Sequence, residues 1–581
     1  MRTLSLAALL TLLLAGCISG QPHAALPSPQ QSTAVLDAAG FVPVQFGQAA
    51  FSEQDLGKDA AGNVLHADVY LPAHPLNASA PSKFPAILLE SPYWAGGTGG
   101  KPVGYMPYDF AVLRLLPRGY AVVFGDLGGE GGSAGCWDFM GPKERASAVA
   151  MVEAIAKQPW SDGKVGMLGL SYDAMTQVMA ASDAAPHLVT VVPSSALTEA
   201  YKGLYMNGVS YGGGWHSTMA GYEAASVQGP GANAARTGGW LATLQQSPAC
   251  LADNSVNGAP TGADGPYWQA RDFRALAKNV KASVFVTQGF FDPAVKPDNF
   301  GAWFQNVPTL KKAWLGFWFH QYPTAANAGR DDLYLTLNRW FDHTLKGVDN
   351  GIDREPAIDV QDSTGAWRHE ASWPPADAVP VTLTSSGDGT LGTLTEAKAG
   401  ALPFGGPMAA TELAAGKGGG ALRLATQPLD ADLHIAGRPV VNLTLTPQGA
   451  AGEVVARLYD GPRMVSQGAF NLLYAGGLDA PRPLTPGQSV RVGFELYPTD
   501  WVVPAGHALT LELNTVDGQT WFDSDAPAAS VSLQAGPGST LALPAVHRDA
   551  AAPFLLSCGK ALKADVPSCF KDRKDQGVPQ S

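Results

Sequence analysis

The sequence predicts an α/β domain with a mainly parallel sheet, followed by an all-β sandwich. Two observations carry this prediction. Over residues 50–350, short apolar runs typical of buried parallel strands alternate with segments of helical periodicity. After about residue 354 the helical periodicity stops, and short alternating segments punctuated by Gly, Pro and Asp replace it, as in β-sandwiches.

The first domain is expected to span residues 41–353. Its predicted strands are residues 64–71, 84–90, 120–126, 165–170, 187–193, 283–288 and 313–317. Its predicted helices are residues 144–157, 174–182 and 331–346. Residues 198–280 contain helical pieces but no apparent strand pair, so we expect an insertion that lies over the sheet as a cap.

The second domain is expected to span residues 354–548, with a polar tail over residues 549–581. Its predicted strands are residues 440–445, 453–459, 489–496, 508–513 and 530–533. Strands of this length, separated by turn residues, are typical of a sandwich of two antiparallel sheets.

Composition excludes several classes of protein. The chain has 581 residues, of which 46% are hydrophobic and 15% charged, so it can form large cores and is not globally disordered. The net charge is −12 without a block of clustered Lys and Arg, so nucleic acid is not an expected partner. The body of the chain has no apolar run of 18 residues, so no internal membrane span is expected.

The N-terminus has the pattern of an export signal. Arg2 precedes an apolar run over residues 4–15, and Leu14-Ala15-Gly16-Cys17 follows. This ending resembles the bacterial lipobox, which implies that residues 1–17 are a lipoprotein signal with Cys17 as the lipidated residue; alternatively, Cys17 is an incidental thiol of an ordinary signal peptide. Residues 18–40 are expected to form a flexible tether. We therefore expect an exported lipoprotein of the cell envelope or extracellular face, which contacts the membrane only through its lipid.

Four cysteines remain, an even number that suits disulfide bonds in an oxidising compartment. Cys558 and Cys569 lie close together in the tail and pair most economically, which leaves Cys136 with Cys250. Four free buried thiols are the alternative. None of the four has C-x-x-C spacing, so a zinc site is not expected.

The densest chemical signal is Gly169-Leu170-Ser171, placed between a predicted buried strand and a helix of small residues. A glycine two residues before a serine at such a turn indicates a nucleophile elbow, in which the strand and helix backbones come close. The alternative is an ordinary strand–helix turn. An α/β-hydrolase also needs an acid and then a histidine beyond later strands. Asp292 and His320 occupy those places, with Asp292 orienting His320 and His320 taking the proton of Ser171.

Several motifs resemble the family of Xaa-Pro dipeptidyl-peptidases, cocaine esterases and α-amino-acid ester hydrolases. They are Trp160-Ser161-Asp162-Gly163-Lys164-Val165-Gly166, Gly169-Leu170-Ser171-Tyr172, Gly289-Phe290-Phe291-Asp292, Gly316-Phe317-Trp318-Phe319-His320 and Trp501-Val502-Val503-Pro504-Ala505-Gly506-His507. The resemblance covers nearly the whole mature chain. It implies an α/β-hydrolase domain with a C-terminal jelly roll, acting without a cofactor.

The resemblance also implies an oxyanion hole made by the backbone N–H of Tyr172 and the hydroxyl of Tyr93. For Tyr93, the alternative is a loop aromatic that packs on the cap. The chain departs from the family pattern at Phe290 and Phe317, and at Asp173-Ala174 after Ser-Tyr. These departures affect the expected substrate more than the expected reaction class.

Two enzymatic functions fit these residues. An exopeptidase releasing Xaa-Pro dipeptides would need a carboxylate to hold the substrate α-ammonium. Its candidate substrate-binding residues are Glu199, Glu223, Asp138 and Trp318. For each acid, the alternative is a solvated surface charge. An esterase or amide acylase would instead have an apolar pocket, and both would use an acyl-enzyme on Ser171. A third interpretation, from the sandwich alone, is a non-catalytic carbohydrate-binding lipoprotein.

Overall fold

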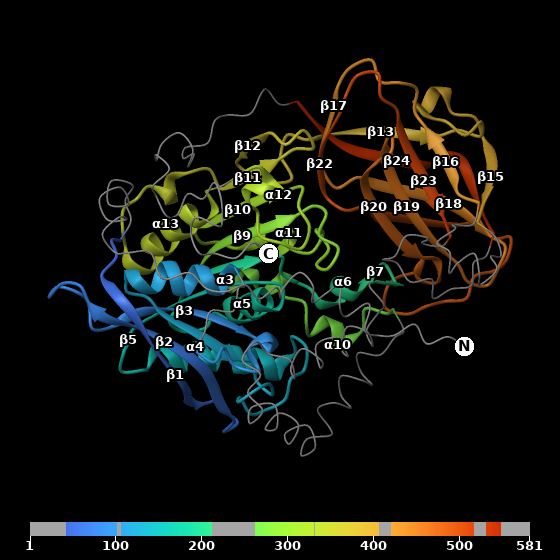
Figure 1. The fold of residues 1–581 in the computed structure, drawn as a ribbon. Coiled ribbons are helices and arrows are strands. Elements are labelled where there is room, and N and C mark those ends of the chain that lie inside the picture. Colours follow the sequence, from blue (N-terminus) through green and yellow to red (C-terminus); the bar gives the residue numbers. More distant parts are fainter. Residues whose placement is uncertain are drawn as a thin grey trace.

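The structure is a computed structural model that describes residues 42–100, 106–211, 262–330, 332–405, 420–515 and 530–547. It has two lobes, a sheet flanked by helices and a lobe built from strands (Figure 1). The helices are α3 (Met106–Phe110), α4 (Pro142–Ala156), α5 (Tyr172–Ser182), α6 (Ala200–Leu204), α10 (Pro266–Gln269), α11 (Gly301–Asn306), α12 (Ala325–Ala328) and α13 (Leu333–Lys346). In the described part of the chain, no helix is long and apolar enough to cross a membrane.

A ten-stranded sheet forms the centre of the first lobe. Its strands are β1 (Phe46–Lys58), β2 (Val64–Pro75), β3 (Phe84–Ser91), β4 (Ala121–Asp126), β5 (Ser161–Leu170), β6 (Leu188–Ser194), β9 (Ser283–Gly289), β10 (Lys311–Gly316), β11 (Ile358–Gln361) and β12 (Trp367–Glu370). They lie in the order β1-β2-β4-β3-β5-β6-β9-β10-β11-β12. The strands from β4 to β11 are parallel, whereas β2 and β12 run antiparallel to their neighbours. The predicted mainly parallel sheet is confirmed, and every strand predicted for this domain forms.

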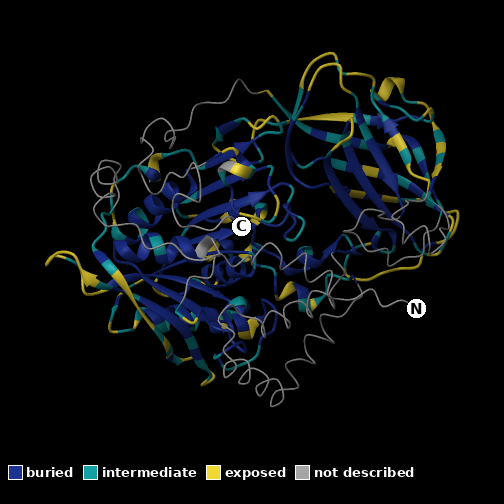
Figure 2. Cartoon of the chain, viewed as in Figure 1, coloured by how far each residue is buried: buried dark blue, intermediate teal, exposed yellow. Residues whose placement is uncertain are grey.

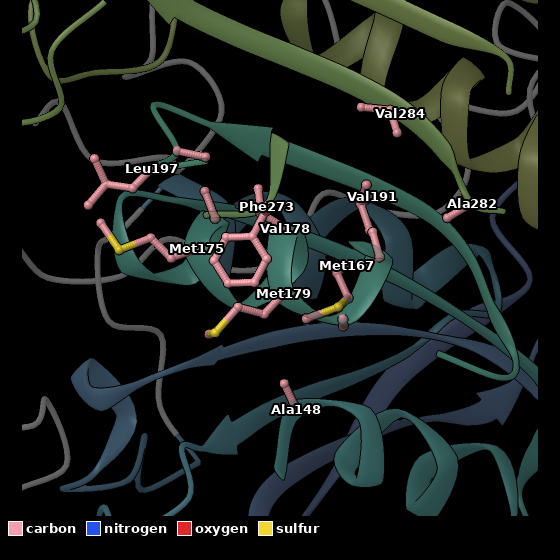
Figure 3. Packing of buried hydrophobic residues seen from close by; sticks show 14 of the residues in the cluster. Ala148, Met167, Met175, Val178, Met179, Val191, Leu197, Phe273, Ala282 and Val284 are labelled. Atoms are coloured by element: carbon pink, nitrogen blue, oxygen red, sulfur yellow. The ribbon is translucent and has the colours of Figure 1, made fainter. Parts of the chain in front are cut away.

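Apolar side chains on both faces of the sheet explain why its strands read as continuous hydrophobic runs. On β3, Ala86 and Leu88 belong to the core beneath α4 and α5, and Ile87 and Leu89 belong to the core beneath α13. Figure 3 shows the first of these cores, with side chains of α5 lying over those of the strands. All residues of α5 are buried, which its small and flexible apolar side chains allow.

The cap segment departs from expectation in one respect. Between α6 and residue 211 the chain forms a short antiparallel pair, β7 (Tyr205–Met206) with β8 (Val209–Ser210). Asn207 and Gly208 connect the two strands with φ of 49° and 82°. An Asn-Gly pair with positive φ is the preferred two-residue hairpin turn, so the expectation of no strand pair was wrong. Most of the remaining cap, residues 212–261, lies outside the described residues.

The second lobe is a β-sandwich, as predicted. Its strands are β13 (Val379–Ser385), β14 (Leu391–Gly392), β15 (Gly400–Phe404), β16 (Leu422–Ala425), β17 (Leu433–Gly437), β18 (Val440–Pro447), β19 (Glu453–Asp460), β20 (Arg463–Asn471), β21 (Val490–Glu495), β22 (Thr499–Val503), β23 (Leu509–Asn514) and β24 (Val531–Val546). They form an eight-stranded and a four-stranded sheet that share one apolar core. Figure 2 shows this core and the central strands of the first sheet as buried, and much of the edge strand β1 as exposed.

The boundary between the two lobes lies further along the chain than residue 354, where the helical periodicity of the sequence stops. The strands β11 and β12 follow residue 354, yet both belong to the ten-stranded sheet. Arg368 on β12 then reaches the sandwich with a two-pronged ion pair, its Nη1 and Nη2 lying 2.7 and 2.6 Å from the carboxylate oxygens of Asp500. The same carboxylate accepts hydrogen bonds from His434 at 2.7 Å and Trp373 Nε1 at 3.2 Å. This buried network joins β22 to the ten-stranded sheet.

Candidate active site

Ser171 occupies a sharp turn between β5 and α5. Its φ of 66° and ψ of −121° are unusual for a residue other than glycine. Its N–H donates to the carbonyl oxygen of Ser194 at 3.0 Å, and its own carbonyl accepts the N–H groups of Ala174 and Met175. A strained conformation of this kind costs about 1–3 kcal/mol and persists where its surroundings fix it. The geometry is that of a nucleophile elbow.

Gly169 is required for this turn, as the sequence predicted. A Cβ atom at position 169 would lie 2.1 Å from the Cβ of Asp173 on the first turn of α5. Such an overlap would push the helix away from the strand. The elbow interpretation is therefore favoured over an ordinary strand–helix turn.

Asp292 and His320 lie just beyond β9 and β10, at the same edge of the sheet as Ser171. The Nδ1 atom of His320 is 2.9 and 3.1 Å from the two carboxylate oxygens of Asp292. Asp292 is 1% exposed, and its Oδ1 also accepts the N–H groups of Ala294 and Val295 at 2.9 and 2.8 Å. Because the carboxylate accepts at Nδ1, the proton of a neutral His320 resides there, and Nε2 is the basic nitrogen.

Ser171 and His320 are not hydrogen-bonded to each other within the described residues; the hydrogen bonds of His320 go to Asp292. Contacts between a nucleophile and its base are often long until substrate binds. The structure therefore brings the predicted acid and histidine into direct contact, and places the predicted nucleophile at the same edge of the sheet.

Tyr93 does meet Ser171. It follows β3, and its N–H donates to Ser91 Oγ at 3.2 Å, which fixes the start of the loop. The Tyr93 hydroxyl lies 3.5 Å from Ser171 Oγ and donates towards it. A hydroxyl held beside the nucleophile in a half-buried position suits a donor to a developing oxyanion.

Replacing Tyr93 with phenylalanine is expected to lower kcat by about 10²–10³, the usual effect of losing one oxyanion donor. The ring and its packing remain, so the melting temperature should change little. Steady-state kinetics with a chromogenic substrate measure the effect. An unchanged kcat would show that Tyr93 only packs in its loop.

The side chain of Tyr172 is buried. Its hydroxyl donates to Glu144 Oε2 at 2.9 Å and accepts from Trp137 Nε1 at 2.5 Å. Glu144 Oε2 also accepts the N–H of Met140 at 2.7 Å. This network anchors the residue whose backbone N–H directly follows the nucleophile. This network could not be predicted from the sequence, because Glu144 and Trp137 lie 28 and 35 residues from Tyr172 along the chain.

Burial raises the pKa of Glu144 to about 8, with a further contribution from the nearby charge of Asp138. The native state therefore holds a proton on Glu144 that the unfolded state releases above its ordinary pKa of 4.5. It follows that this group favours the folded state below pH 4.5 and that its contribution is lost as the pH rises through 8.

Glu144→Gln is expected to remove that pH dependence. Glutamine keeps an acceptor for Tyr172 and Met140 but carries no titrating proton. Between pH 5 and 8, the melting temperature of the wild type should therefore fall more steeply than that of the variant. Thermal unfolding across this pH range measures both slopes, and parallel slopes would contradict the assignment.

The predicted substrate-binding acids are engaged by protein groups. Asp138 accepts the N–H groups of Lys143 and Glu144 at 3.0 and 2.9 Å, so its carboxylate stabilises the N-terminus of α4. Glu199 lies 3.0 Å from Arg274 and 3.9 Å from Lys202. Burial raises the pKa of Glu199 to about 7, and the two cations oppose that rise. Neither acid is the solvated surface charge offered as its alternative. Glu223 lies outside the described residues.

Trp318 does not line an open surface. It is 1% exposed and stacks on Trp367, with ring centroids 6.0 Å apart. Glycines at the ends of β9 and β10 make room for this residue. A Cβ atom at Gly289 would lie 2.1 Å from the carbonyl oxygen of Trp318, and one at Gly316 would lie 2.5 Å from its ring. Trp318, two residues before His320, is therefore a packing residue rather than the substrate contact that was predicted.

Cys136 is disulfide-bonded, and its partner lies outside the described residues. The other cysteines singled out in the sequence, Cys17, Cys250, Cys558 and Cys569, all lie outside them too, so the pairing stays a prediction. Among the side chains that the structure describes, no group of three or more His, Cys, Asp or Glu could hold a metal ion.

The strand order, the elbow at Ser171 and the Asp292–His320 pair at the ends of later strands define an α/β-hydrolase. Two family models match the chain. X-Pro dipeptidyl-peptidase (S15 family) matches residues 61–322, and the X-Pro dipeptidyl-peptidase C-terminal non-catalytic domain matches residues 350–537. The chain belongs to this family of serine hydrolases.

Similar proteins agree with this assignment. A putative Xaa-Pro dipeptidyl-peptidase of Streptomyces avermitilis is 29% identical over 74% of this chain and 73% of its own length. One from Bacillus anthracis is 28% identical over 75% and 78%. Among solved structures, an aminopeptidase from a marine sediment archaeon, Thaumarchaeota archaeon, has a TM-score of 0.67 at 17% identity, covering 91% of this chain and 99% of that one. An α-amino acid ester hydrolase has a TM-score of 0.67 at 18% identity with the same coverage. These matches give no support to the non-catalytic carbohydrate-binding interpretation.

Proposed function

We propose that this serine hydrolase is an exopeptidase that releases Xaa-Pro dipeptides through an acyl-enzyme on Ser171. The observation that carries the mechanism is the Asp292–His320 hydrogen bond of 2.9 Å at the sheet edge that holds the Ser171 elbow. The substrate class is supported by the family and by relatives named Xaa-Pro dipeptidyl-peptidases.

The proposed reaction begins when Ser171 Oγ attacks the carbonyl carbon of the scissile bond and His320 Nε2 takes the hydroxyl proton. Asp292, buried and fixed by two backbone N–H groups, stabilises the resulting imidazolium. The tetrahedral oxyanion accepts hydrogen bonds from the Tyr93 hydroxyl and the Tyr172 N–H. The C–N bond then breaks and His320 gives the proton to the leaving amine. Water, deprotonated by His320, hydrolyses the acyl-enzyme in the same way.

The alternative is an esterase or amide acylase acting on small acyl groups or amino-acid esters. One observation favours it: the carboxylates of Glu199 and Asp138 are engaged within the protein, so neither is set aside for a substrate α-ammonium. The acyl-enzyme mechanism is the same for both functions.

A panel of three chromogenic substrates separates the two functions. Gly-Pro-p-nitroanilide tests the exopeptidase, its N-acetylated form tests the need for a free α-ammonium, and p-nitrophenyl acetate tests the esterase. The exopeptidase predicts a high kcat/KM for the first substrate and a loss of at least tenfold on acetylation. Efficient hydrolysis of the acetate ester with no turnover of Gly-Pro-p-nitroanilide would overturn it in favour of the alternative. Ser171→Ala provides the background rate.

We also propose that the protein is an exported lipoprotein anchored through Cys17, with a Cys136–Cys250 disulfide between the catalytic domain and the cap. The Leu14-Ala15-Gly16-Cys17 sequence supports the anchor, and the disulfide-bonded state of Cys136 supports the bond. Metabolic labelling with palmitate, compared with Cys17→Ala, tests the anchor. Non-reducing peptide mapping tests the disulfide, and Cys136 joined to Cys558 or Cys569 would contradict it.

A further inference from the structure

Four aromatic side chains, Trp501, Phe317, Phe291 and Phe290, form what we call the aromatic bridge. The ring of Phe317 is at its centre, 5.6 Å from Trp501, 5.1 Å from Phe291 and 5.2 Å from Phe290 between centroids. Trp501 belongs to the core of the sandwich and Phe290 to the core of the hydrolase sheet. The bridge is therefore continuous from one lobe into the other.

The bridge touches both loops that hold the candidate catalytic pair. Phe290 and Phe291 immediately precede Asp292, and Phe317 lies three residues before His320. Phe291 and Phe317 pack against the sandwich core and are themselves only partly buried. The ring of Phe317 in one loop packs on the rings of Phe290 and Phe291 in the other, and this contact fixes the distance between the loops and hence the Asp292–His320 hydrogen bond.

Trp501 is held firmly on the sandwich side. It is 1% exposed, its Nε1 donates to Asp460 Oδ2 at 3.1 Å, and the guanidinium of Arg463 lies 4.4 Å from its ring centroid. The preceding residue, Asp500, is tied to Arg368 of the catalytic sheet by the two-pronged ion pair. The indole thus has a fixed position relative to both lobes (Figure 1 shows β22 beside β11 and β12).

Phe317 is one of the positions at which the chain departs from the family pattern. Its backbone N–H donates to Gln361 Oε1 at 3.3 Å. Its ring supplies all three aromatic contacts of the bridge. In this chain, the residue that departs from the pattern therefore connects the sandwich to the catalytic loops.

We infer that Trp501 of the sandwich is a positioning residue for the Asp292–His320 pair, acting through Phe317. The family model that matches this lobe describes a non-catalytic domain. In the proposed role, Trp501 touches neither the substrate nor the reacting atoms. The sandwich would nevertheless set the geometry on which proton transfer depends. The inference rests on the proposed roles of Asp292 and His320, and it does not depend on which acyl substrate is used.

The test compares Trp501→Leu with Phe494→Leu in the full chain. Phe494 is a buried aromatic of the same sandwich, 5.7 Å from Phe470, and it has no ring contact with the four bridge residues. Both variants lose a large side chain from one core, so both should lower the melting temperature. Trp501→Phe serves as the conservative variant if Trp501→Leu fails to fold.

Trp501→Leu should lower kcat by about 10- to 100-fold with KM changed by less than threefold, since displacement of a catalytic group by about 1 Å can cost 10²-fold. Phe494→Leu should leave kcat within twofold of the wild type, and Trp501→Phe should recover most of the rate. Adding Trp501→Leu to Phe317→Leu should produce little further loss, because within the bridge Trp501 contacts only Phe317. Equal kcat values for Trp501→Leu and Phe494→Leu would overturn the inference.

A second readout does not depend on activity. Amide hydrogen exchange in residues 289–299 and 316–322 should become faster in Trp501→Leu and stay unchanged in Phe494→Leu. Unchanged exchange in both variants would overturn the inference. Faster exchange in Trp501→Leu, together with full activity in Asp292→Asn, would instead show that the bridge positions these loops but that the proposed catalytic pair is wrong.

Discussion

Replacing Ser171 with alanine should lower kcat by a factor of about 10⁴ or more and abolish labelling by a fluorophosphonate probe. In the proposed mechanism Ser171 Oγ forms the acyl-enzyme, so no neighbouring group can replace it. The turn should survive, because its three backbone hydrogen bonds do not involve the serine hydroxyl. A melting temperature close to that of the wild type would show this.

Ser195→Ala is a matched control for that experiment. Ser195 is a buried serine with a φ of 50° directly after β6, the strand next to β5. Its loss should leave labelling and kcat close to the wild type. Near-normal turnover by Ser171→Ala would contradict the mechanism as a whole.

Replacing Asp292 with asparagine should lower kcat by about 10⁴, because an amide can donate to His320 Nδ1 and so favours the tautomer with its proton on Nε2. His320 Nε2 would then carry a hydrogen and have no lone pair with which to accept the proton of Ser171. Asparagine keeps an oxygen to accept the N–H groups of Ala294 and Val295, so the loop should keep its fold. Kinetics and thermal unfolding together separate the two effects.

The control is Asp298→Asn, six residues further along the chain. Asp298 is buried but makes no hydrogen bond to His320 within the described residues. It should retain kcat within a few fold of the wild type. An equal loss of kcat in both variants would mean that the loop does not tolerate asparagine at either position, and it would contradict a specific role of Asp292 in orienting His320.

The central sheet could be predicted because strands buried on both faces leave continuous apolar runs such as residues 84–90. The edge strand β1 was missed for the opposite reason. Much of it is exposed, and its sequence FGQAAFSEQDLGK lacks a regular apolar pattern. The strands β11 and β12 have four residues each and include polar side chains with partners far away in the chain. Asp359 pairs with Arg330, Gln361 donates to the carbonyl oxygen of Ala328, and Arg368 pairs with Asp500.

The candidate site could be predicted where position along the chain decides the role. Chain order and strand ends led to Ser171, Asp292 and His320 as candidates, and the motif resemblance led to Tyr93. Roles that depend on tertiary partners could not be predicted in this way. Asp138 caps a helix, Glu199 pairs with Arg274, and Trp318 packs under a loop; the sequence offered no sign of these partners.

The membership of β11 and β12 in the ten-stranded sheet limits how this protein can be dissected. The matched C-terminal domain begins at residue 350, before either strand. A chain cut there would leave the catalytic half with β10 as a bare edge, whose apolar centre Ala313-Trp314-Leu315 now pairs with β11. An unpaired, flat and apolar edge strand invites association with other copies. A soluble catalytic fragment would have to extend beyond Glu370, and even then it would lack the partner that Asp500 provides for Arg368.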